Sequence, residues 1–307
     1  MFANTEEKVI WKNGTYEKWE EASVHLLSHT MHYGTGVFEG VRAYKTEHGP
    51  AIFRLQDHTN RLFEAASKLG IKIPYSPDEL NQVQKDIFIK NNLDEGYLRP
   101  IVFLGSESLG IRATELSVNV AVAAWEWPSY MSPEAKESGI SVIKSSYDQY
   151  SNPLHSGYKI IGTYINSTMA LHEAIQNGAD EAILLDKDGY ISEGSGENIF
   201  IIKDGIISTP LTNHCLNGIT RQSVIQISKD LGYELIEKNI TMDDLLKSDE
   251  AFFTGTAVEI TPISKIDGLS IGTGSRGPIT ENLQKTYNDV IFGKNSNYSH
   301  WLSLTSE

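Results

Sequence analysis

A segment with two prolines near the middle of the chain separates two predicted strands, and this segment most constrains the possible fold. Val118–Trp127 is rich in β-branched and aromatic residues, as is typical of a sheet strand, and Ile140–Lys144 shows the same pattern. Between them, Pro128–Lys136 reads PSYMSPEAK, and its two prolines disfavour both helix and strand interiors. We therefore predict a linker at 128–136, a small domain at 1–127 and a larger one at 137–307.

Both predicted domains mix helices with strands. Asn13-Gly14 suits the left-handed positions of a hairpin turn, and Asp57 is a plausible first cap for a helix that ends before Gly70. Further predicted helices follow Pro77 and cover Thr163–Asn177 and Thr220–Leu231, and further strands cover Tyr97–Leu104, Glu181–Leu185 and Asn198–Ile202. Because strands cluster without strict alternation with helices, the predicted fold class is α+β in two domains.

Composition and charge exclude several partners. The chain has 307 residues, 40% of them hydrophobic, which is enough for two cores. A formal net charge of −14 repels phosphate backbones, so we expect no nucleic-acid partner. No apolar run reaches the roughly 18 to 20 residues of a membrane span, and the N-terminus lacks an apolar signal core. The single Cys215 fits a reducing compartment, so we expect a soluble cytoplasmic protein.

Lys159 stands in the apolar segment HSGYKIIGTY, between Tyr158 and Ile160. A lysine becomes a Schiff-base nucleophile when apolar surroundings lower its pKa. On this segment alone, a solvated lysine at a strand end is the more frequent case. The segment therefore marks a candidate and no more.

Two acids lie among small residues in YISEGSGENIF, at 190–200. A glutamate fixed near a strand can hydrogen-bond a pyridinium nitrogen and keep it protonated. Glu193 and Glu197 are the candidates. A glycine-rich hairpin with exposed acids explains the segment equally well.

Two further segments offer backbone N–H groups. In LNGITR at 216–221, Gly218 precedes a predicted helix whose first residues, Ile219 and Thr220, could bind an anion. FFTGTAVE at 252–259 could donate hydroxyls and amides to a phosphate or carboxylate. An ordinary helix start and a tight turn are the alternatives.

Two other patterns do not support a site. GTGSRG at 272–277 is followed by Pro278, and the acid that a dinucleotide site needs about 20 residues later is missing. His25, His29 and His32 lack the glutamate of a zinc-binding HExxH helix, so we predict no metal.

Taken together, these segments resemble the class IV aminotransferases, which are pyridoxal-phosphate enzymes of fold type IV. The strongest stretches are SHTMHYGTGVFEGV at 28–41, DHTNRL at 57–62, YLRP at 97–100, and the segments 190–200, 216–221 and 254–262. HYGTGVFEG and YLRP resemble the branch that acts on branched-chain amino acids. The resemblance implies a two-domain α+β fold with pyridoxal 5'-phosphate at the domain interface.

The resemblance also assigns roles to individual residues. Lys159 would bind the cofactor covalently and move the substrate proton, and Glu193 would partner the pyridine nitrogen, with Glu197 as second choice. The other implied cofactor residues are Tyr164 at the phenolic oxygen, and Arg61, Ile219, Thr220 and Thr256 at the phosphate. The lysine segment is bulkier than the family pattern, and Lys144 is a rival. Only Lys159 has a tyrosine, Tyr164, at the matching offset.

For the substrate, the resemblance implies binding of the α-carboxylate by the amides of Thr256 and Ala257 and the hydroxyl of Tyr97. Arg99 would bind the distal carboxylate of glutamate, because its planar fork suits a carboxylate. The implied apolar lining is Tyr33, Phe38 and Trp127, with Ile111 and Tyr130 contributed by a neighbouring subunit.

The expected activity is ping-pong transfer of an amino group between leucine, isoleucine or valine, in the L form, and 2-oxoglutarate, in a homodimer or larger homo-oligomer. Within the family, a D-amino acid aminotransferase and an aminodeoxychorismate lyase are the alternatives. Outside it, the alternative is a non-catalytic ligand-binding α+β protein. Tyr97-Leu98-Arg99 favours the branched-chain assignment, and Lys159 with Glu193 favours an enzyme.

Overall fold

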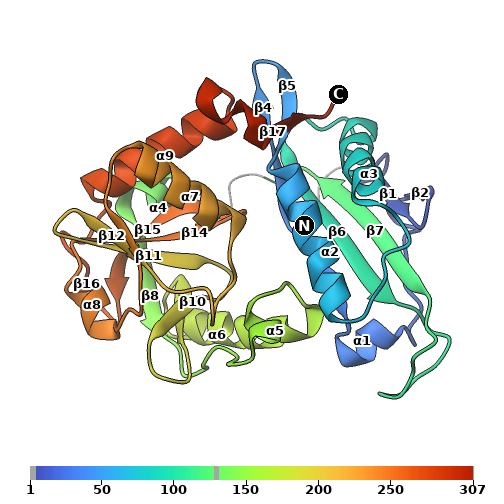
Figure 1. Ribbon diagram of the computed structural model, residues 1–307, viewed down its shortest axis with the longest axis horizontal. Coiled ribbons are helices and arrows are strands. Elements are labelled where there is room, and N and C mark those ends of the chain that lie inside the picture. The colour runs from blue at the N-terminus through green and yellow to red at the C-terminus, as the bar shows by residue number, and fades with distance from the viewer. Residues whose placement is uncertain (1–4, 128–130, 307) are drawn as a thin grey trace. The chain divides into compact units, whose positions relative to one another are not determined.

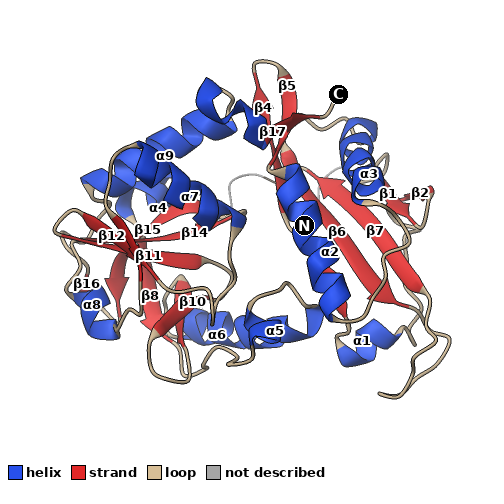
Figure 2. Ribbon diagram, in the orientation of Figure 1, coloured by secondary structure: helices blue, strands red, loops and turns tan. Residues whose placement is uncertain are grey.

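The chain mixes helices and strands in two compact units, each with its own sheet. The computed structural model describes residues 5–127 and 131–306. The first unit comprises Met1–Pro128, Lys159–Gly162 and Asp289–Glu307, and the second comprises Ser129–Tyr158 and Thr163–Asn288. Figures 1 and 2 show the elements of both units. The predicted α+β class is confirmed.

The first unit is built on an antiparallel sheet in the order β17-β5-β4-β6-β7-β1-β2, with β3 paired to β6. Its strands are β1 (Val9–Lys12), β2 (Thr15–Lys18), β3 (Gly36–Phe38), β4 (Val41–Thr46), β5 (Gly49–Phe53), β6 (Gly96–Leu104), β7 (Val118–Trp125) and β17 (Leu302–Leu304). Its helices are α1 (His29–Tyr33), α2 (Leu55–Lys68), α3 (Pro77–Lys90) and η2 (Ser296–Trp301). The predicted first hairpin is confirmed, with positive φ at Asn13 and Gly14.

The two faces of this sheet differ. Leu98 and Val102 of β6 are fully buried, whereas the alternate residues Arg99 and Ile101 are only partly covered. Successive side chains of a strand point to opposite faces. Helix α3 packs on β6 and β7, and α2 packs on α3 and β3 (Figure 1). The helices therefore account for the buried face, and Arg99 lies on the other face.

The start of α2 differs from the sequence prediction. Asp57 is not the cap: the helix begins at Leu55, after Arg54 in a left-handed conformation with φ of 51°. The Asp57 carboxylate instead accepts from Arg54 Nε at 2.6 Å. The predicted helix after Pro77 is confirmed, because Ser76 and Glu79 form a reciprocal capping box.

The second unit contains a mixed sheet in the order β10-β9-β8-β15-β14-β11-β12-β13, with β16 paired to β15. Its strands are β8 (Ile140–Lys144), β9 (Glu181–Leu185), β10 (Ile191–Gly194), β11 (Asn198–Lys203), β12 (Ile206–Thr209), β13 (Leu235–Glu237), β14 (Glu250–Gly255), β15 (Glu259–Ile266) and β16 (Leu269–Ser270). The helices from residue 133 onward are α4 (Pro133–Ser138), α5 (Pro153–Ser156), η1 (Ile161–Thr163), α6 (Tyr164–Gln176), α7 (Ile219–Asp230), α8 (Met242–Leu246) and α9 (Pro278–Ile291). The predicted strands and helices of this half are confirmed to within two residues.

The predicted linker is partly helical. Pro133 begins α4, and the Ser132 side chain accepts from Ala135 N at 3.1 Å. Proline is compatible with the first helical turn, where its missing N–H has no intrahelical partner. Residues 128–130, among them Tyr130, lie outside the described residues.

Two short segments group with the first unit, although the sequence boundaries placed them in the second domain. Lys159–Gly162 does so because Ile160 pairs with Val37, and the C-terminal segment does so because β17 pairs with β5. The boundaries at 127 and 137 remain a prediction. Among the described residues, no helix is long and apolar enough to cross a membrane.

Candidate active site

Backbone contacts hold Lys159 against the segment that leads into β4. Phe38 N donates to Lys159 O at 3.1 Å, and Gly162 N donates to Gly34 O at 3.0 Å. The lysine is half-buried, and its Nζ lies 5.7 Å from the centroid of the Phe38 ring. The predicted nucleophile is thus fixed through its own carbonyl oxygen and through Gly162 three residues later, and its Nζ lies near an aromatic face.

Gly34 is required for this arrangement. Its φ is 68°, and a Cβ there would lie 2.4 Å from Gly162 Cα. We expect Gly34→Ala to lower the free energy of unfolding by more than about 2 kcal/mol, because left-handed strain and a backbone clash add together. Denaturant unfolding measures this loss.

Gly70→Ala is the matched control. Gly70 has φ of 71°, but a Cβ there would meet no atom within 4 Å, so only left-handed strain of about 1 kcal/mol is expected. Equal losses in the two variants would show that the close approach to Gly162 does not matter.

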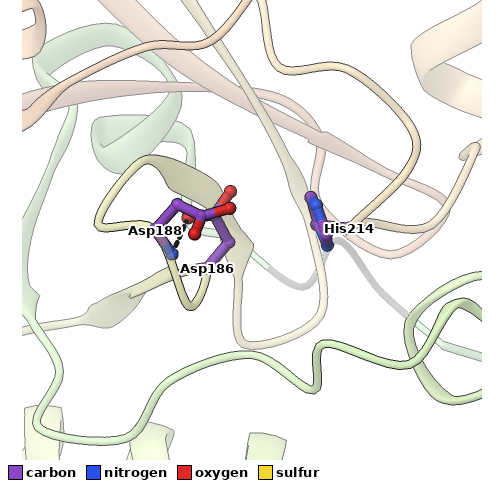
Figure 3. A group of neighbouring side chains, drawn as sticks. All are labelled: Asp186, Asp188 and His214. Carbon is purple, nitrogen blue, oxygen red and sulfur yellow. Dashed lines mark hydrogen bonds between the residues drawn. The ribbon is translucent and has the colours of Figure 1, made fainter.

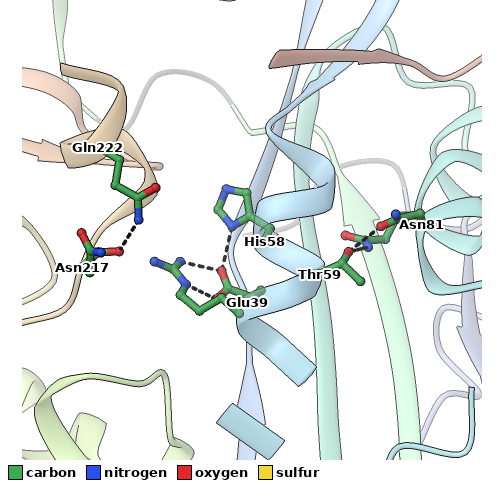
Figure 4. A network of polar contacts seen from close by, with 8 residues as sticks. Glu39, His58, Thr59, Asn81, Asn217 and Gln222 are labelled. Atoms are coloured by element: carbon green, nitrogen blue, oxygen red, sulfur yellow. Dashed lines mark hydrogen bonds and ion pairs between the residues drawn. The ribbon is translucent and has the colours of Figure 1, made fainter. Parts of the chain in front are cut away.

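A buried ion pair joins the end of β3 to α2. Glu39 Oε1 accepts from Arg61 Nε at 2.6 Å, and Glu39 Oε2 accepts from Arg61 Nη2 and His58 Nδ1, each at 2.8 Å (Figure 4). Burial alone would raise the pKa of Glu39, but the Arg61 charge and the His58 hydrogen bond hold that pKa well below its usual range. Arg61, the predicted phosphate residue, is thus anchored by an ionised carboxylate.

Arg99 lies against aromatic rings. Its Cζ is 4.7 Å from the centroid of the Phe38 ring and 5.5 Å from that of Tyr97. Within the described part of the chain, Arg99 Nε is buried without a hydrogen-bond partner, and no ion pair holds this guanidinium. The Tyr97 ring also contacts Trp127, with centroids 4.5 Å apart. Phe38, Tyr97, Arg99 and Trp127 therefore form one cluster.

The same face of the sheet carries an apolar groove of about 580 Å³. Its wall includes Met31, Arg99, Ile101, Phe103, Ala121 and Ala123. Two other predicted residues are more exposed: Tyr33 is 42% exposed and Ile111 is 88% exposed. The groove thus offers mainly hydrocarbon surface, with the cationic side chains of Arg99 and Lys12 in its wall.

In the second unit, Glu193 is buried and receives a hydrogen bond on each carboxylate oxygen. Gln149 Nε2 donates to Oε1 at 2.5 Å, and Leu216 N donates to Oε2 at 3.1 Å. Donors to a carboxylate favour its charged form. Glu193 is therefore well placed to remain an anion, which a partner of a protonated pyridine must be.

The second candidate acid, Glu197, has a different environment. Its Oε2 accepts from Gly196 N at 3.0 Å. Burial raises the pKa of Glu181, whose carboxyl group also shares a hydrogen bond with Glu197. The contacts of Glu197 with Gly196 and Glu181 are consistent with a structural role in this loop. Glu193 therefore stays the preferred candidate for the partner of the pyridine nitrogen.

Helix α7 begins without a side-chain cap. Gly218 is its N-cap residue, and a Cβ there would lie 2.1 Å from Asn198 Oδ1. Ile219 and Thr220 therefore start the helix with backbone N–H groups that no cap side chain satisfies. Such a start favours an anion. Arg221 Nη2 secures the preceding loop through Pro210 O at 2.9 Å and through Glu237 at 2.6 Å.

The remaining predicted residues of this unit lie at element ends. Thr256 and Ala257 are half-buried in the turn between β14 and β15, and Tyr164 is half-buried as the first residue of α6. Glu259 closes the turn with φ of 58° and an ion pair to Lys136 at 2.6 Å. Thr254 Oγ1, near the end of β14, is buried without a partner in the described chain.

Sequence reasoning missed three residues that hold the predicted ones. Glu39 and His58 stood inside recognised motifs, and the spacing of His58 and Arg61 on one helix face was a usable signal. Gln149 had no signal, because its contact with Glu193 joins two segments that are distant in sequence.

One further group of side chains lies near the β9–β10 turn. Asp186, Asp188 and His214 each have a side-chain atom that could coordinate a metal ion, and these atoms lie within 4.8 Å of one another (Figure 3). Asp186 Oδ1 accepts from Asp188 N at 2.9 Å and from Tyr190 N at 3.0 Å. These bonds close the turn, and they explain the position of both acids.

Comparison with known proteins identifies the class. A sequence profile of the family Amino-transferase class IV matches residues 36–266. The chain therefore belongs to the class IV aminotransferases.

The relatives are more specific. The chain is 52% identical over 297 residues to a branched-chain-amino-acid aminotransferase of Pseudomonas aeruginosa, covering 96% of this chain and 97% of the relative. Two structures of the T.th. branched-chain amino acid aminotransferase each superpose with a TM-score of 0.93 over 97% of this chain and 99% of theirs. The one with N-(5'-phosphopyridoxyl)-L-glutamate is 43% identical, and the one with 4-methylvaleric acid is 42% identical.

Proposed function

We propose that this protein transfers the amino group between branched-chain L-amino acids and 2-oxoglutarate, with pyridoxal 5'-phosphate as its cofactor. The observation that carries the proposal is Arg99, a guanidinium laid on aromatic rings beside an apolar groove. Apolar walls suit leucine, and the guanidinium suits the distal carboxylate of glutamate. The relative from Pseudomonas aeruginosa supports the same assignment.

The residues fit the cofactor on two structural points. The uncapped start of α7 offers N–H groups to a phosphate, and Arg61 is the assigned cation for the same group. Glu193 is a buried carboxylate with a donor on each oxygen, as a partner of a protonated pyridine requires. Lys159 would hold the cofactor covalently.

The chemistry divides between the cofactor and the chain. When bound, pyridoxal 5'-phosphate withdraws electrons from the substrate Cα and acidifies its C–H bond. Lys159 Nζ would take the proton from Cα and deliver it to the cofactor carbon that bears the amino group, and Glu193 would hold the pyridine nitrogen protonated. Tyr164 would donate to the phenolic oxygen, and Thr256 would support the phosphate.

The substrate residues must serve two different side chains. The amides of Thr256 and Ala257, with the Tyr97 hydroxyl, hold the α-carboxylate that all substrates share. Phe38, Tyr33 and Trp127 line the apolar part. The T.th. enzyme forms crystalline complexes with N-(5'-phosphopyridoxyl)-L-glutamate and with 4-methylvaleric acid, which supports binding of an acidic and an apolar compound by the same enzyme.

Arg99→Ala is expected to lower the specificity constant for glutamate far more than that for leucine. A hydrogen bond to a charged group is worth about 1.5 to 3 kcal/mol, so the specificity constant for glutamate should fall roughly tenfold to a hundredfold. The specificity constant for leucine should change by less than about tenfold, because its side chain does not bind the guanidinium. Single-turnover kinetics with each amino donor measure the two losses.

Lys12→Ala is the control for this prediction, because Lys12 lines the same groove and pairs with Glu17 at 3.6 Å. Lys12→Ala should change the specificity constants for leucine and glutamate slightly and equally. Equal losses for leucine and glutamate in Arg99→Ala would make Arg99 a structural residue and weaken the branched-chain assignment.

We also propose a cytoplasmic homodimer or larger homo-oligomer, with Ile111 and Tyr130 serving the site of a neighbouring subunit. Exposed apolar side chains support this assembly: Ile111 is 88% exposed and Leu26 is 71% exposed. One cysteine in 307 residues fits the cytoplasm. Light scattering should give at least twice the mass of one chain, and a fully active monomer would refute the assembly.

A panel of amino donors tests the function. The purified protein, supplied with pyridoxal 5'-phosphate and 2-oxoglutarate, should form glutamate from L-leucine, L-isoleucine and L-valine. Activity confined to D-alanine or D-glutamate would favour a D-amino acid aminotransferase, and release of pyruvate from aminodeoxychorismate would favour the lyase. A protein that binds no cofactor would be a non-catalytic one.

A further inference from the structure

Glu39 uses both carboxylate oxygens on one edge of the Arg61 guanidinium. The Arg61 Nε contact is 2.6 Å and the Nη2 contact is 2.8 Å, so two of the five N–H donors of the arginine point at this carboxylate. The other three donors lie outside this pair, and two of them are on Nη1. A guanidinium bound by one edge has a fixed plane, and its opposite edge has a fixed direction.

His58 fixes Glu39 in turn. Its Nδ1 lies 2.8 Å from Glu39 Oε2, and both side chains are 1% exposed. Burial lowers the pKa of His58, and the Arg61 and Lys159 charges add to this effect against the opposing influence of Glu39. A neutral imidazole that bonds a carboxylate through Nδ1 carries its proton there. The Glu39–Arg61–His58 cluster therefore consists of one anion, one cation and one neutral donor.

We propose that Glu39, held by His58, is a positioning residue that sets the direction in which Arg61 presents its remaining donors to the cofactor phosphate. The inference rests on the proposed function, because it needs Arg61 to bind that phosphate. Glu39 itself carries the same charge sign as the phosphate. Glu39 therefore favours phosphate binding only by orienting the Arg61 guanidinium, and its negative charge opposes that binding.

Glu39→Gln separates these two effects. All three contacts to Glu39 come from donors, and a glutamine can accept at only one of its two terminal atoms. Its amide N–H₂ must face Arg61 or His58, so the fixed plane of the guanidinium is lost. Loss of the negative charge alone would tighten phosphate binding. A positioning role predicts the opposite.

The experiment compares two probes, pyridoxal 5'-phosphate and pyridoxal, which lacks the phosphate. Binding is followed by absorbance and by protein fluorescence, without turnover. Glu39→Gln should lower the affinity for pyridoxal 5'-phosphate by about tenfold to a hundredfold, the loss expected for one hydrogen bond to a charged group. Its affinity for pyridoxal should change by less than about twofold, a change too small to reflect loss of such a bond.

Two further variants make the test specific. In an Arg61→Gln background, Glu39→Gln should have no additional effect on either probe, because there is no guanidinium left to orient. Asp57→Asn alters a different ion pair at the start of α2, between Asp57 and Arg54, and should leave the affinity for both probes unchanged.

Three outcomes would overturn the positioning role. They are unchanged or tighter binding of pyridoxal 5'-phosphate in Glu39→Gln, equal losses for both probes, and an undiminished effect in the Arg61→Gln background. If the unaltered protein binds neither probe, the proposed function itself fails. Thermal unfolding of each variant identifies any loss that comes from unfolding, and Arg61→Lys is the fallback partner variant should Arg61→Gln not fold.

Discussion

Lys159→Ala is expected to reduce transamination of L-leucine by about a thousandfold or more, the upper part of the range for a positioned acid–base group. The variant loses both the covalent attachment and the amine that moves the Cα proton. Added methylamine should restore part of the rate, because a small free amine can replace the missing Nζ. Steady-state rates with leucine and 2-oxoglutarate measure the loss.

Lys144→Ala is the matched control, because Lys144 is the rival lysine and is exposed at the end of β8. It should keep nearly full activity. Borohydride reduction of the holo protein, followed by peptide mapping, should place the phosphopyridoxyl label on Lys159. A label on Lys144, or a Lys159→Ala variant that retains about a tenth or more of the activity, would contradict the assignment.

Glu193→Gln is expected to lose about a hundredfold in turnover, the order found when a preorganised electrostatic contact is removed. A neutral amide does not hold the pyridine nitrogen protonated, so the substrate Cα–H becomes less acidic. Cofactor binding should persist, because the residues assigned to the phosphate are unchanged. Turnover and bound cofactor are measured on the same preparation.

Glu197→Gln is the control for this variant. Glu197 belongs to the carboxyl pair with Glu181, so its replacement should affect stability more than turnover. Near-normal turnover in Glu193→Gln, together with a large loss in Glu197→Gln, would exchange the roles of the two acids.

The sequence predicted the regular parts of the fold well, because local pattern determines them. Asn13-Gly14 forms the predicted hairpin turn, and the predicted helix after Pro77 is fixed at its start by the Ser76–Glu79 capping box, which also acts over a few residues. The start of α2 was placed wrongly, because Arg54 adopts a left-handed conformation that nothing in its neighbours indicates. The helix in the predicted linker was missed, because proline can begin a helix as well as break one.

The candidate site followed from motifs, whereas its supporting contacts did not. Lys159, Glu193 and Arg61 belong to segments with a recognisable chemistry. Gln149 donates to Glu193 from 44 residues away, and Glu39 accepts from Arg61 across 22 residues. Such pairs depend on tertiary packing, which one sequence does not specify residue by residue.

The proposed function depends most on one site that processes an apolar and an acidic substrate in alternate half-reactions. Stopped-flow absorbance of the holo protein, mixed with L-leucine or L-glutamate and no oxo acid, tests this directly. Both donors should convert all of the bound cofactor to its amine form, and 2-oxoglutarate should then restore the starting spectrum in either sample. Conversion by L-glutamate but not by L-leucine, or by D-amino acids alone, would contradict the proposed function.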